Sequence, residues 1–284
     1  MSPFDFLIAW SRFAYGQQSI SVDNPGGPAV LHWNVEDELP AGIARVIADL
    51  RSRADAFIFL SGGASNMAES DLEALLDLFR CFEMLSARGL RFAVGDGGTR
   101  AGIMEAAGRS RAASGNAFPL LGVAPAPEVG ADGRSGATEI DTNHSHVLTV
   151  TNAPWLEAQK EKGWEPSWGY WGSETEAMYE VFDRLSAGRR SVAIVANGGG
   201  KTLDEVERNL RQGRRIIVVS GSGRAADALV AALEGTTASP DVERFGERIS
   251  SLQVGQRRDS FRIFRLETGP EALSDLLMRE LSPP

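Results

Sequence analysis

The sequence predicts an α/β fold, a Rossmann-like three-layer α/β/α sandwich with a mostly parallel central sheet. Short apolar runs rich in β-branched residues alternate with amphipathic helical patterns almost from end to end, which is typical of parallel strands joined by helices. Several of these runs end in glycines that a helical pattern follows, as in strand-to-helix turns. With 284 residues and 43% hydrophobic content, the chain is long enough to bury a large core.

The order of the elements follows from these runs. The predicted strands are residues 29–33, 56–63, 90–98, 120–125, 146–150, 191–200, 215–223 and 261–266. Apolar side chains recur at helical spacing over 72–85 and 225–233, and an amphipathic helix is expected at 270–281. We expect a single domain over residues 1–284, with a core at about 20–235 and an extension at 236–284 whose strand and helix pack on that core.

Charge and cysteine content narrow the function. The net charge of -9 and pI near 5.0 provide no general attraction for phosphate backbones, so nucleic acid is not an expected partner. A small anionic ligand remains compatible, because backbone amides and one or two cations can hold it. The single cysteine, Cys81, fits a reducing cytoplasm. The apolar stretch at residues 4–10 is too short for a signal peptide or a membrane span, so neither targeting nor membrane insertion is expected.

Residues 195–202, VANGGGKT, end in the Gly-Lys-Thr found in phosphate loops. A triphosphate loop needs a glycine where this chain has Val195, so the stretch is not expected to be one. Thr202 is a candidate N-cap of the following helix, and Glu205 would then complete a capping box. Glu205 has either this structural role or a functional one. Lys201 is either a phosphate contact or a solvated turn residue.

Glycine clusters follow four of the predicted strands, and a parallel sheet gathers such turns at one edge, where ligands of open α/β sheets bind. Glycine after a strand can also serve only a tight turn. Arg224 is the preferred phosphate contact, because a planar guanidinium fits phosphate oxygens. The candidate ligand-binding residues of these turns are Gly62, Gly63, Gly97, Gly98, Thr99, Arg100, Asn197, Gly198, Gly199, Lys201, Thr202, Gly221, Ser222, Gly223 and Arg224.

The segment at residues 141–147, DTNHSHV, carries two histidines. His144 and His146 would share one side of a strand and could bind a metal if a third ligand approached. The favoured interpretation has no metal: Asn143 and His144 make hydrogen bonds that shape the ligand-binding edge.

Aromatic residues gather between residues 155 and 171, where four tryptophans and a tyrosine lie among charged residues and glycines without clear periodicity. This segment could be a lid, or a surface for a homo-oligomer or a protein partner. A long loop held by tryptophans over an open sheet edge is the structural alternative.

In order along the chain, the segments FLSGGASN, GDGGTRAGIM, LLGVAP, DTNHSHV, GYWGSETEAM, NGGGKTLDEV and VVSGSGRAAD resemble the SLOG superfamily of Rossmann-like nucleotide-binding domains. Within it they resemble the prokaryotic branch that is similar to the cytosolic N-terminal domain of melastatin-type (TRPM) cation channels. The resemblance covers about residues 20–235. It implies a ligand of the ADP-ribose type at the edge of the sheet, with Gly97, Gly98, Thr99 and residues 221–224 in the family's turns.

The related LOG enzymes hydrolyse the N-glycosidic bond of cytokinin nucleotides. Their turn ending in Gly-Leu-Met is similar to residues 102–104, and their Pro-Gly-Gly-x-Gly-Thr-x-x-Glu pattern is similar to residues 197–205, which lack the proline and have Lys201 in place of a glycine. This resemblance implies Glu205 as a catalytic residue.

Together, these features predict a cytoplasmic module that binds or senses a nucleotide of the ADP-ribose type, without a further cofactor. A nucleotide N-glycosidase with Glu205 as its acid/base is the first alternative. A scaffold whose glycine turns are purely structural is the second.

Overall fold

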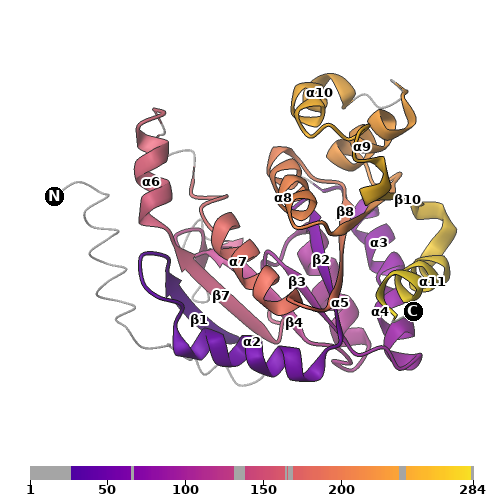
Figure 1. The fold of residues 1–284 in the computed structure, drawn as a ribbon. Helices are drawn as coiled ribbons and strands as arrows, with labels where there is room; N and C mark the ends of the chain where they lie inside the picture. The colour runs from indigo at the N-terminus through magenta and orange to yellow at the C-terminus, as the bar shows by residue number, and fades with distance from the viewer. Residues whose placement is uncertain are drawn as a thin grey trace.

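The computed structural model describes residues 27–64, 67–130, 138–163, 165, 169–236 and 241–282. Its centre is an eight-stranded sheet in the order β1-β7-β4-β3-β2-β8-β9-β10, and every neighbouring pair is parallel (Figure 1). The strands are β1 (Ala29–Asn34), β2 (Ala56–Gly62), β3 (Phe92–Asp96), β4 (Leu120–Pro125), β7 (His146–Thr151), β8 (Arg190–Ala196), β9 (Arg215–Ser220) and β10 (Phe261–Arg265). Two further short strands, β5 (Val129–Gly130) and β6 (Thr138–Glu139), pair with each other.

All eight strands predicted from the sequence are present. Of the four that were expected to include glycines at their ends, β3, β8 and β9 end before those glycines and β2 ends at Gly62. The central strands are nearly continuous apolar runs because helices cover both faces of the sheet. The residues of β2 from Ala56 to Leu60, for example, are all buried. The three-layer arrangement predicted from the sequence is therefore confirmed.

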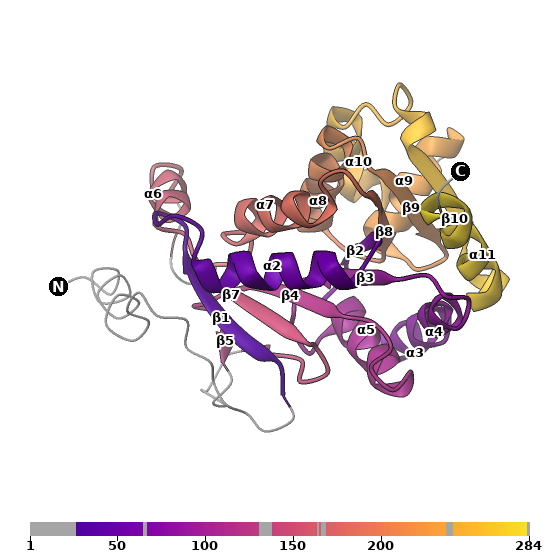
Figure 2. The same cartoon turned by 60° about the horizontal axis from the view of Figure 1, so that its bottom comes forward.

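Alternate side chains of the strands face two different helical layers. One layer contains α3 (Glu69–Leu78), α4 (Arg80–Ala87), α5 (Gly102–Ala113) and α11 (Gly269–Leu281). The other contains α2 (Ala41–Arg53), α7 (Thr175–Ser186), α8 (Gly200–Arg211), α9 (Arg224–Glu234) and α10 (Val242–Ser251). Figure 2 shows α2, α7 and α8 on one side of the sheet and α5 and α4 on the other.

The predicted helix at 72–85 is instead two helices that meet at Phe79. Ser110 of α5 donates a hydrogen bond from its hydroxyl to the Phe79 carbonyl over 2.8 Å. That carbonyl also accepts only an i+3 bond, from the Phe82 N–H at 3.0 Å. The α-helical ladder is thus interrupted at this residue.

The C-terminal extension adds to the same sheet. Strand β10 pairs in parallel with β9, and α11 packs on α4 and β8. The aromatic segment also contains a helix that its sequence pattern did not predict, α6 (Ala153–Lys160). This helix begins at Asn152, whose side-chain oxygen accepts the Trp155 N–H at 3.0 Å, and it has a proline in its first turn. Trp164 and Trp168 lie outside the described residues.

Candidate functional site

The order in which the chain adds strands to the sheet reverses between β2 and β8, although these two strands are parallel. From β2 the chain proceeds to β3 and β4 on one side, and it later returns to β8 on the other side of β2. Helix α3 follows β2 into one layer, whereas α8 follows β8 into the opposite layer. The carboxyl ends of such neighbouring strands form the crevice in which open α/β sheets bind ligands.

The glycines at the end of β2 are required by packing. A Cβ atom on Gly62 would lie 2.3 Å from the carbonyl oxygen of Ala196, and one on Gly63 would lie 2.6 Å from the side-chain oxygen of Asn197. The Gly63 carbonyl also accepts the Ile103 N–H at 3.0 Å, which fixes the start of α5. These two predicted ligand-binding residues therefore bring β2, β8 and α5 close together.

Asn197 joins the turn after β8 to the turn after β9. Its N–H donates to the Ser222 hydroxyl at 2.8 Å, and its side-chain amide donates to the Ser222 carbonyl at 2.7 Å. Its side-chain oxygen accepts the Gly198 N–H at 2.8 Å. Asn197 has a φ of 55°, a left-handed conformation that asparagine tolerates better than most residues. The two turns therefore act as one rigid unit.

The glycine turn after β9 already contains an anion from the protein. Asp227 accepts the Gly221 N–H at 2.7 Å and the Gly223 N–H at 3.2 Å. Both glycines have positive φ angles, so that their amide groups point toward this carboxylate. A phosphate would have to compete with Asp227 for these two amides.

Helix α8 begins differently from the expected capping box. Its N-cap is Gly199, and Thr202 lies three residues into the helix, so the predictions of Thr202 as N-cap and Glu205 as its capping partner are wrong. The Thr202 hydroxyl accepts the Gly199 N–H at 3.1 Å. Within the described part of the chain, the amides of Gly200, Lys201 and Thr202 have no hydrogen-bond acceptor. Amides of this kind are suited to anions.

Two cationic side chains lie near the start of α8. A Cβ atom on Gly199 would be 3.5 Å from Nη2 of Arg224, so the guanidinium of the β9–α9 turn reaches the N-terminus of α8. Lys201 is exposed, and its ammonium lies against Gly172, where a Cβ atom would be only 2.4 Å from Nζ.

The turn at residues 97–100 is packed more tightly than its sequence predicts. Gly98 donates its N–H to Asp96 at 2.8 Å, and Arg100 pairs with Glu139 at 3.0 Å. Thr99 is only 1% exposed and forms a bridge with Ile140. The segment before β7 therefore covers this turn.

His144 lies beneath that turn between two aspartates. Its ring nitrogens contact Asp141 Oδ2 at 3.0 Å and Asp96 Oδ1 at 2.7 Å. Burial alone would lower the pKa of His144, but the two carboxylates outweigh it and raise the pKa to about 9. Both nitrogens of the imidazolium thus donate to aspartate. His144 precedes β7 and does not lie within it, so it does not share a strand face with His146.

Asn143 lies away from the β2–β8 crevice. Its side chain donates to Asp141 at 3.2 Å, and its carbonyl accepts Arg111 Nη1 at 2.6 Å near the C-terminal end of α5. Among the described residues, the contacts of Asn143 are thus with Asp141 and Arg111 and not with the turns at Asn197 and Gly223, whereas His144 supports the turn after β3 through Asp96. No group of three or more His, Cys, Asp or Glu side chains within the described ranges is arranged to hold a metal ion.

Glu205 faces the sheet from the second turn of α8 and interacts with the Ser61 hydroxyl of β2. Burial, together with the charge of Glu174, raises the pKa of Glu205 to about 8, although the Ser61 hydrogen bond opposes the shift. Burial likewise raises the pKa of Glu174 to about 7, against the opposing Gly172 N–H bond of 2.8 Å and the Lys201 charge. Two carboxyl groups with raised pKa values therefore influence each other beside the crevice, and of the two Glu205 holds its proton more firmly at neutral pH.

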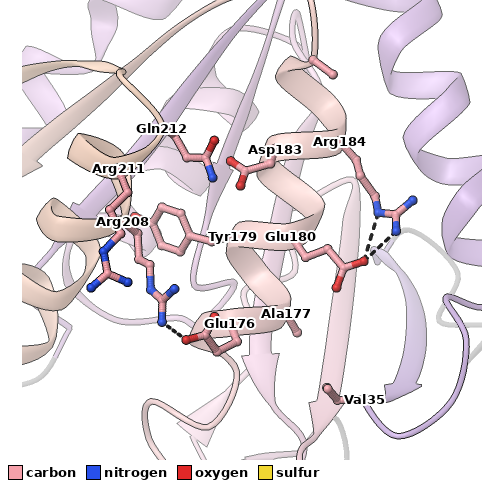
Figure 3. A pocket seen from close by; sticks show the side chains of 11 residues that line it. Val35, Glu176, Ala177, Tyr179, Glu180, Asp183, Arg184, Arg208, Arg211 and Gln212 are labelled. Atoms are coloured by element: carbon pink, nitrogen blue, oxygen red, sulfur yellow. Dashed lines mark hydrogen bonds and ion pairs between the residues drawn. The ribbon is translucent and has the colours of Figure 1, made fainter.

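A charged groove of ≈ 600 Å³ runs between α7 and α8 (Figure 3). Its cations are paired, as in the contacts of Arg208 with Glu176 and of Arg184 with Glu180. Tyr179 lines this groove and donates its hydroxyl to the Glu205 carbonyl at 3.1 Å. The predicted ligand-binding residues do not line it.

The family model described as SLOG in TRPM, prokaryote, matches residues 55–262, more than two thirds of the chain. The chain belongs to this family. The matched SLOG region runs from the start of β2 into β10 and contains all four glycine turns. It both begins and ends later than the resemblance inferred from the sequence, which covered about residues 20–235. No curated protein matches the chain. Every helix that the structure describes is too short or too polar to cross a lipid bilayer.

The sequence did not single out Ser61, Glu174 or Asp227. Asp227 lies three residues after the end of the GSGR turn, in the first turn of α9, and an acidic residue at this distance from a glycine turn is a usable signal for an internal anion. Ser61 and Glu174 lie on other elements than Glu205 and become candidate site residues only because they interact with it. No local sequence pattern reveals such interactions.

Proposed function

We propose that this SLOG domain binds a nucleotide of the ADP-ribose type in the crevice between the carboxyl ends of β2 and β8. The observation that carries the proposal is the convergence of the unpartnered first-turn amides of α8 with the guanidinium of Arg224, which lies 3.5 Å from the Cβ position of Gly199. A helix N-terminus next to an arginine favours a phosphate group through both the amide dipoles and charge-assisted hydrogen bonds.

The diphosphate would lie against Gly200, Lys201 and Thr202, because these residues carry the amides without an internal acceptor in the described part of the chain. Asn197 holds this turn in place through Ser222. The turns at 97–100 and 221–223 support the site from behind, since Asp96 and Asp227 already bind their amides. Gly198 is required by its φ of 95° and by Thr202, whose hydroxyl oxygen would lie 2.4 Å from a Cβ atom there, whereas the Cβ position of Gly200 has no atom of the described residues beyond its own helical turn within 4 Å and is open to a ligand.

The carboxyl groups of Glu174 and Glu205 are suited to the ribose. A protonated carboxyl both donates and accepts hydrogen bonds, as a ribose hydroxyl requires. Since the pKa values of Glu174 and Glu205 are raised to about 7 and about 8, they carry less negative charge beside the phosphates at neutral pH than ordinary carboxylates would.

Calorimetric titration with ADP-ribose, its cyclic isomers, NAD and AMP tests the proposal. We expect saturable binding of at least one of them. Arg224→Ala should weaken it on the order of tenfold or more, since a charge-assisted hydrogen bond contributes about 1.5–3 kcal/mol, and Lys201→Ala should weaken it less. Arg100→Ala is the matched control, because Arg100 pairs with Glu139. Absence of saturable binding for all four ligands would reject the proposal.

A second function, cleavage of a nucleotide N-glycosidic bond, is favoured by one observation. The carboxyl group of Glu205, with a pKa raised to about 8 and a second carboxyl group nearby, has the protonation state of a general acid at neutral pH. A protonated Glu205 could donate its proton to a departing base, while Glu174 assists water on the sugar carbon.

Chromatographic product analysis after incubation with nucleoside monophosphates or NAD separates the two functions. Cleavage should be lost in Glu205→Gln and retained in Glu207→Gln, a control on the same helix whose side chain instead pairs with Arg248. Turnover that is unchanged in Glu205→Gln would exclude Glu205 as the acid. If the wild-type chain binds the nucleotide but forms no product, the cleavage function is rejected and the binding function is retained.

A further inference from the structure

A second cavity, of ≈ 410 Å³, lies at the edge of the sheet opposite the β2–β8 crevice. It is formed where α2, α4 and α5 end and where β3, β4 and β7 begin. Unlike the groove between α7 and α8, this base cavity is lined by cationic and neutral side chains, with no carboxylate in its lining. The side chains relevant here are Arg53, Arg91, Arg111, Ser86, Ser145 and His146.

Backbone carbonyls hold two of these arginines in place. Arg111 donates from Nε to the Phe118 carbonyl at 2.9 Å and from Nη1 to the Asn143 carbonyl at 2.6 Å. Arg91 donates to the Arg53 and Ser52 carbonyls at 3.1 and 2.5 Å. These hydrogen bonds stabilise the ends of a helix and of neighbouring loops, which is a structural role of the two arginines. They also fix the guanidinium planes, so that little side-chain entropy remains to be lost when a ligand binds.

Two polar groups that line this cavity have no hydrogen-bond partner among the described residues. Across the described ranges, Nη2 of Arg111 has no hydrogen-bond acceptor and no carboxylate lies within ion-pair distance of this arginine. The buried hydroxyl oxygen of Ser86 also has no hydrogen-bond partner among those residues. A buried hydroxyl without a partner is costly unless water or a ligand satisfies it.

The charge balance at the cavity is positive. Arg53 pairs with Asp49 at 3.0 Å and Arg91 with Asp55 at 3.6 Å, but both pairs are exposed and therefore weak. Burial lowers the pKa of His146 below the ordinary 6.5; among the nearby charges Asp49 has the largest effect and raises this pKa, while Arg53 and Arg111 each lower it. Two cations thus act on one imidazole from α2 and α5.

We propose that the base cavity binds the phosphate group of a small phosphomonoester, held by Arg53 and Arg111 with the Ser86 hydroxyl as a further donor. Planar guanidinium groups match phosphate oxygens in charge and geometry. The cavity volume is within the range of small-ligand sites of about 300–1,000 Å³, so it accommodates more than an inorganic ion. This site is independent of the β2–β8 crevice, because it lies at the other end of the strands.

His146 gives a direct readout of this site by NMR. The other two histidines differ clearly from each other, since burial lowers the pKa of His32 to about 4 and two aspartates raise that of His144 to about 9; site-specific assignment identifies the His146 resonance. Titration with inorganic phosphate, and separately with AMP, should raise the His146 pKa with a saturable dose response, because the bound anion offsets the two arginines. Acetate at equal ionic strength tests whether any small anion suffices.

Variants distinguish the site from general salt effects. Arg53→Gln and Arg111→Lys should each weaken the phosphate response on the order of tenfold, as expected for a lost charge-assisted hydrogen bond. Arg80→Gln is the control, because Arg80 is also an exposed arginine in a helical ion pair, with Asp77, but does not line the cavity. Arg53 is on the surface, so that its replacement does not threaten folding. A His146 pKa that phosphate and AMP leave unchanged, or equal responses in Arg53→Gln and Arg80→Gln, would overturn the proposal.

Discussion

Asn197 and Ser222 are joined by two hydrogen bonds, of 2.8 and 2.7 Å, that link the turn after β8 to the turn after β9. This link sets the position of Arg224 relative to the N-terminus of α8. The arginine comes from one turn and the amides from the other, so that the proposed phosphate site depends on the rigidity of the pair.

Replacement of Asn197 by alanine should therefore lower the free energy of unfolding by about 2–4 kcal/mol, as a sum of lost buried hydrogen bonds and left-handed backbone strain. Urea denaturation measures the change. Asn116→Ala is the matched control: Asn116 also has a positive φ, is exposed and makes no side-chain hydrogen bond within the described structure. Equal losses in the two variants would show that backbone conformation alone matters.

The Asp227 carboxylate should be replaceable by an external anion. Asp227→Ala removes the acceptor for the Gly221 and Gly223 amides and should lower the free energy of unfolding by about 1–3 kcal/mol. Added sulfate should restore part of this loss, because the vacated amides form an anion nest. Sulfate also stabilises folded proteins in general, so the comparison is with Asp275→Ala, which removes an exposed ion pair. An equal sulfate effect in both variants would contradict an anion role for Asp227.

Glu205 should make the folded chain less stable as the pH rises. Its pKa is raised to about 8 from an ordinary 4.5, so the folded state keeps a proton that the unfolded state releases. The associated stability is full below about 4.5 and is lost by about 8. Glu205→Gln cannot ionise, and its stability relative to the wild type should increase by about 4 kcal/mol between pH 5 and pH 8.5.

Chemical denaturation at these two pH values checks this prediction. Glu207→Gln serves as the control, because hydrogen bonds from Arg248 lower the pKa of Glu207; its stability contribution is present above the ordinary pKa and stays constant across the tested window. A difference between the wild type and Glu205→Gln that does not vary with pH would show that the Glu205 carboxyl is ionised throughout.

His144 should remain protonated at neutral pH. Its pKa is raised to about 9 by Asp96 and Asp141, so its contribution to stability is present below 6.5 and is lost as the pH rises through about 9. NMR titration of the imidazole measures this pKa, and Asp96→Asn should lower it. A His144 that titrates at or below 6.5 would mean that burial outweighs the two carboxylates.

The strands were predictable because they are short apolar runs rich in β-branched residues, four of which glycine clusters follow. The break at Phe79 was not, since it depends on Ser110 from another helix. Thr202 was expected to be an N-cap because the local sequence cannot show that the helix already starts at Gly200. The Asp96–His144–Asp141 cluster joins residues up to 48 positions apart, and such long-range contacts leave no local signal. The glycine turns follow strands of one parallel sheet, as the sequence predicted, but the sequence does not show which of their amides the protein itself occupies.

A structure of the chain with bound ADP-ribose, or with whichever nucleotide binds most tightly, tests the central claim most directly. The expected result is a diphosphate within hydrogen-bond distance of the Gly200, Lys201 and Thr202 amides and of the Arg224 guanidinium, with the ribose beside Glu205. A nucleotide bound in the groove between α7 and α8, or at the Asp227 turn with its carboxylate displaced, would contradict the account.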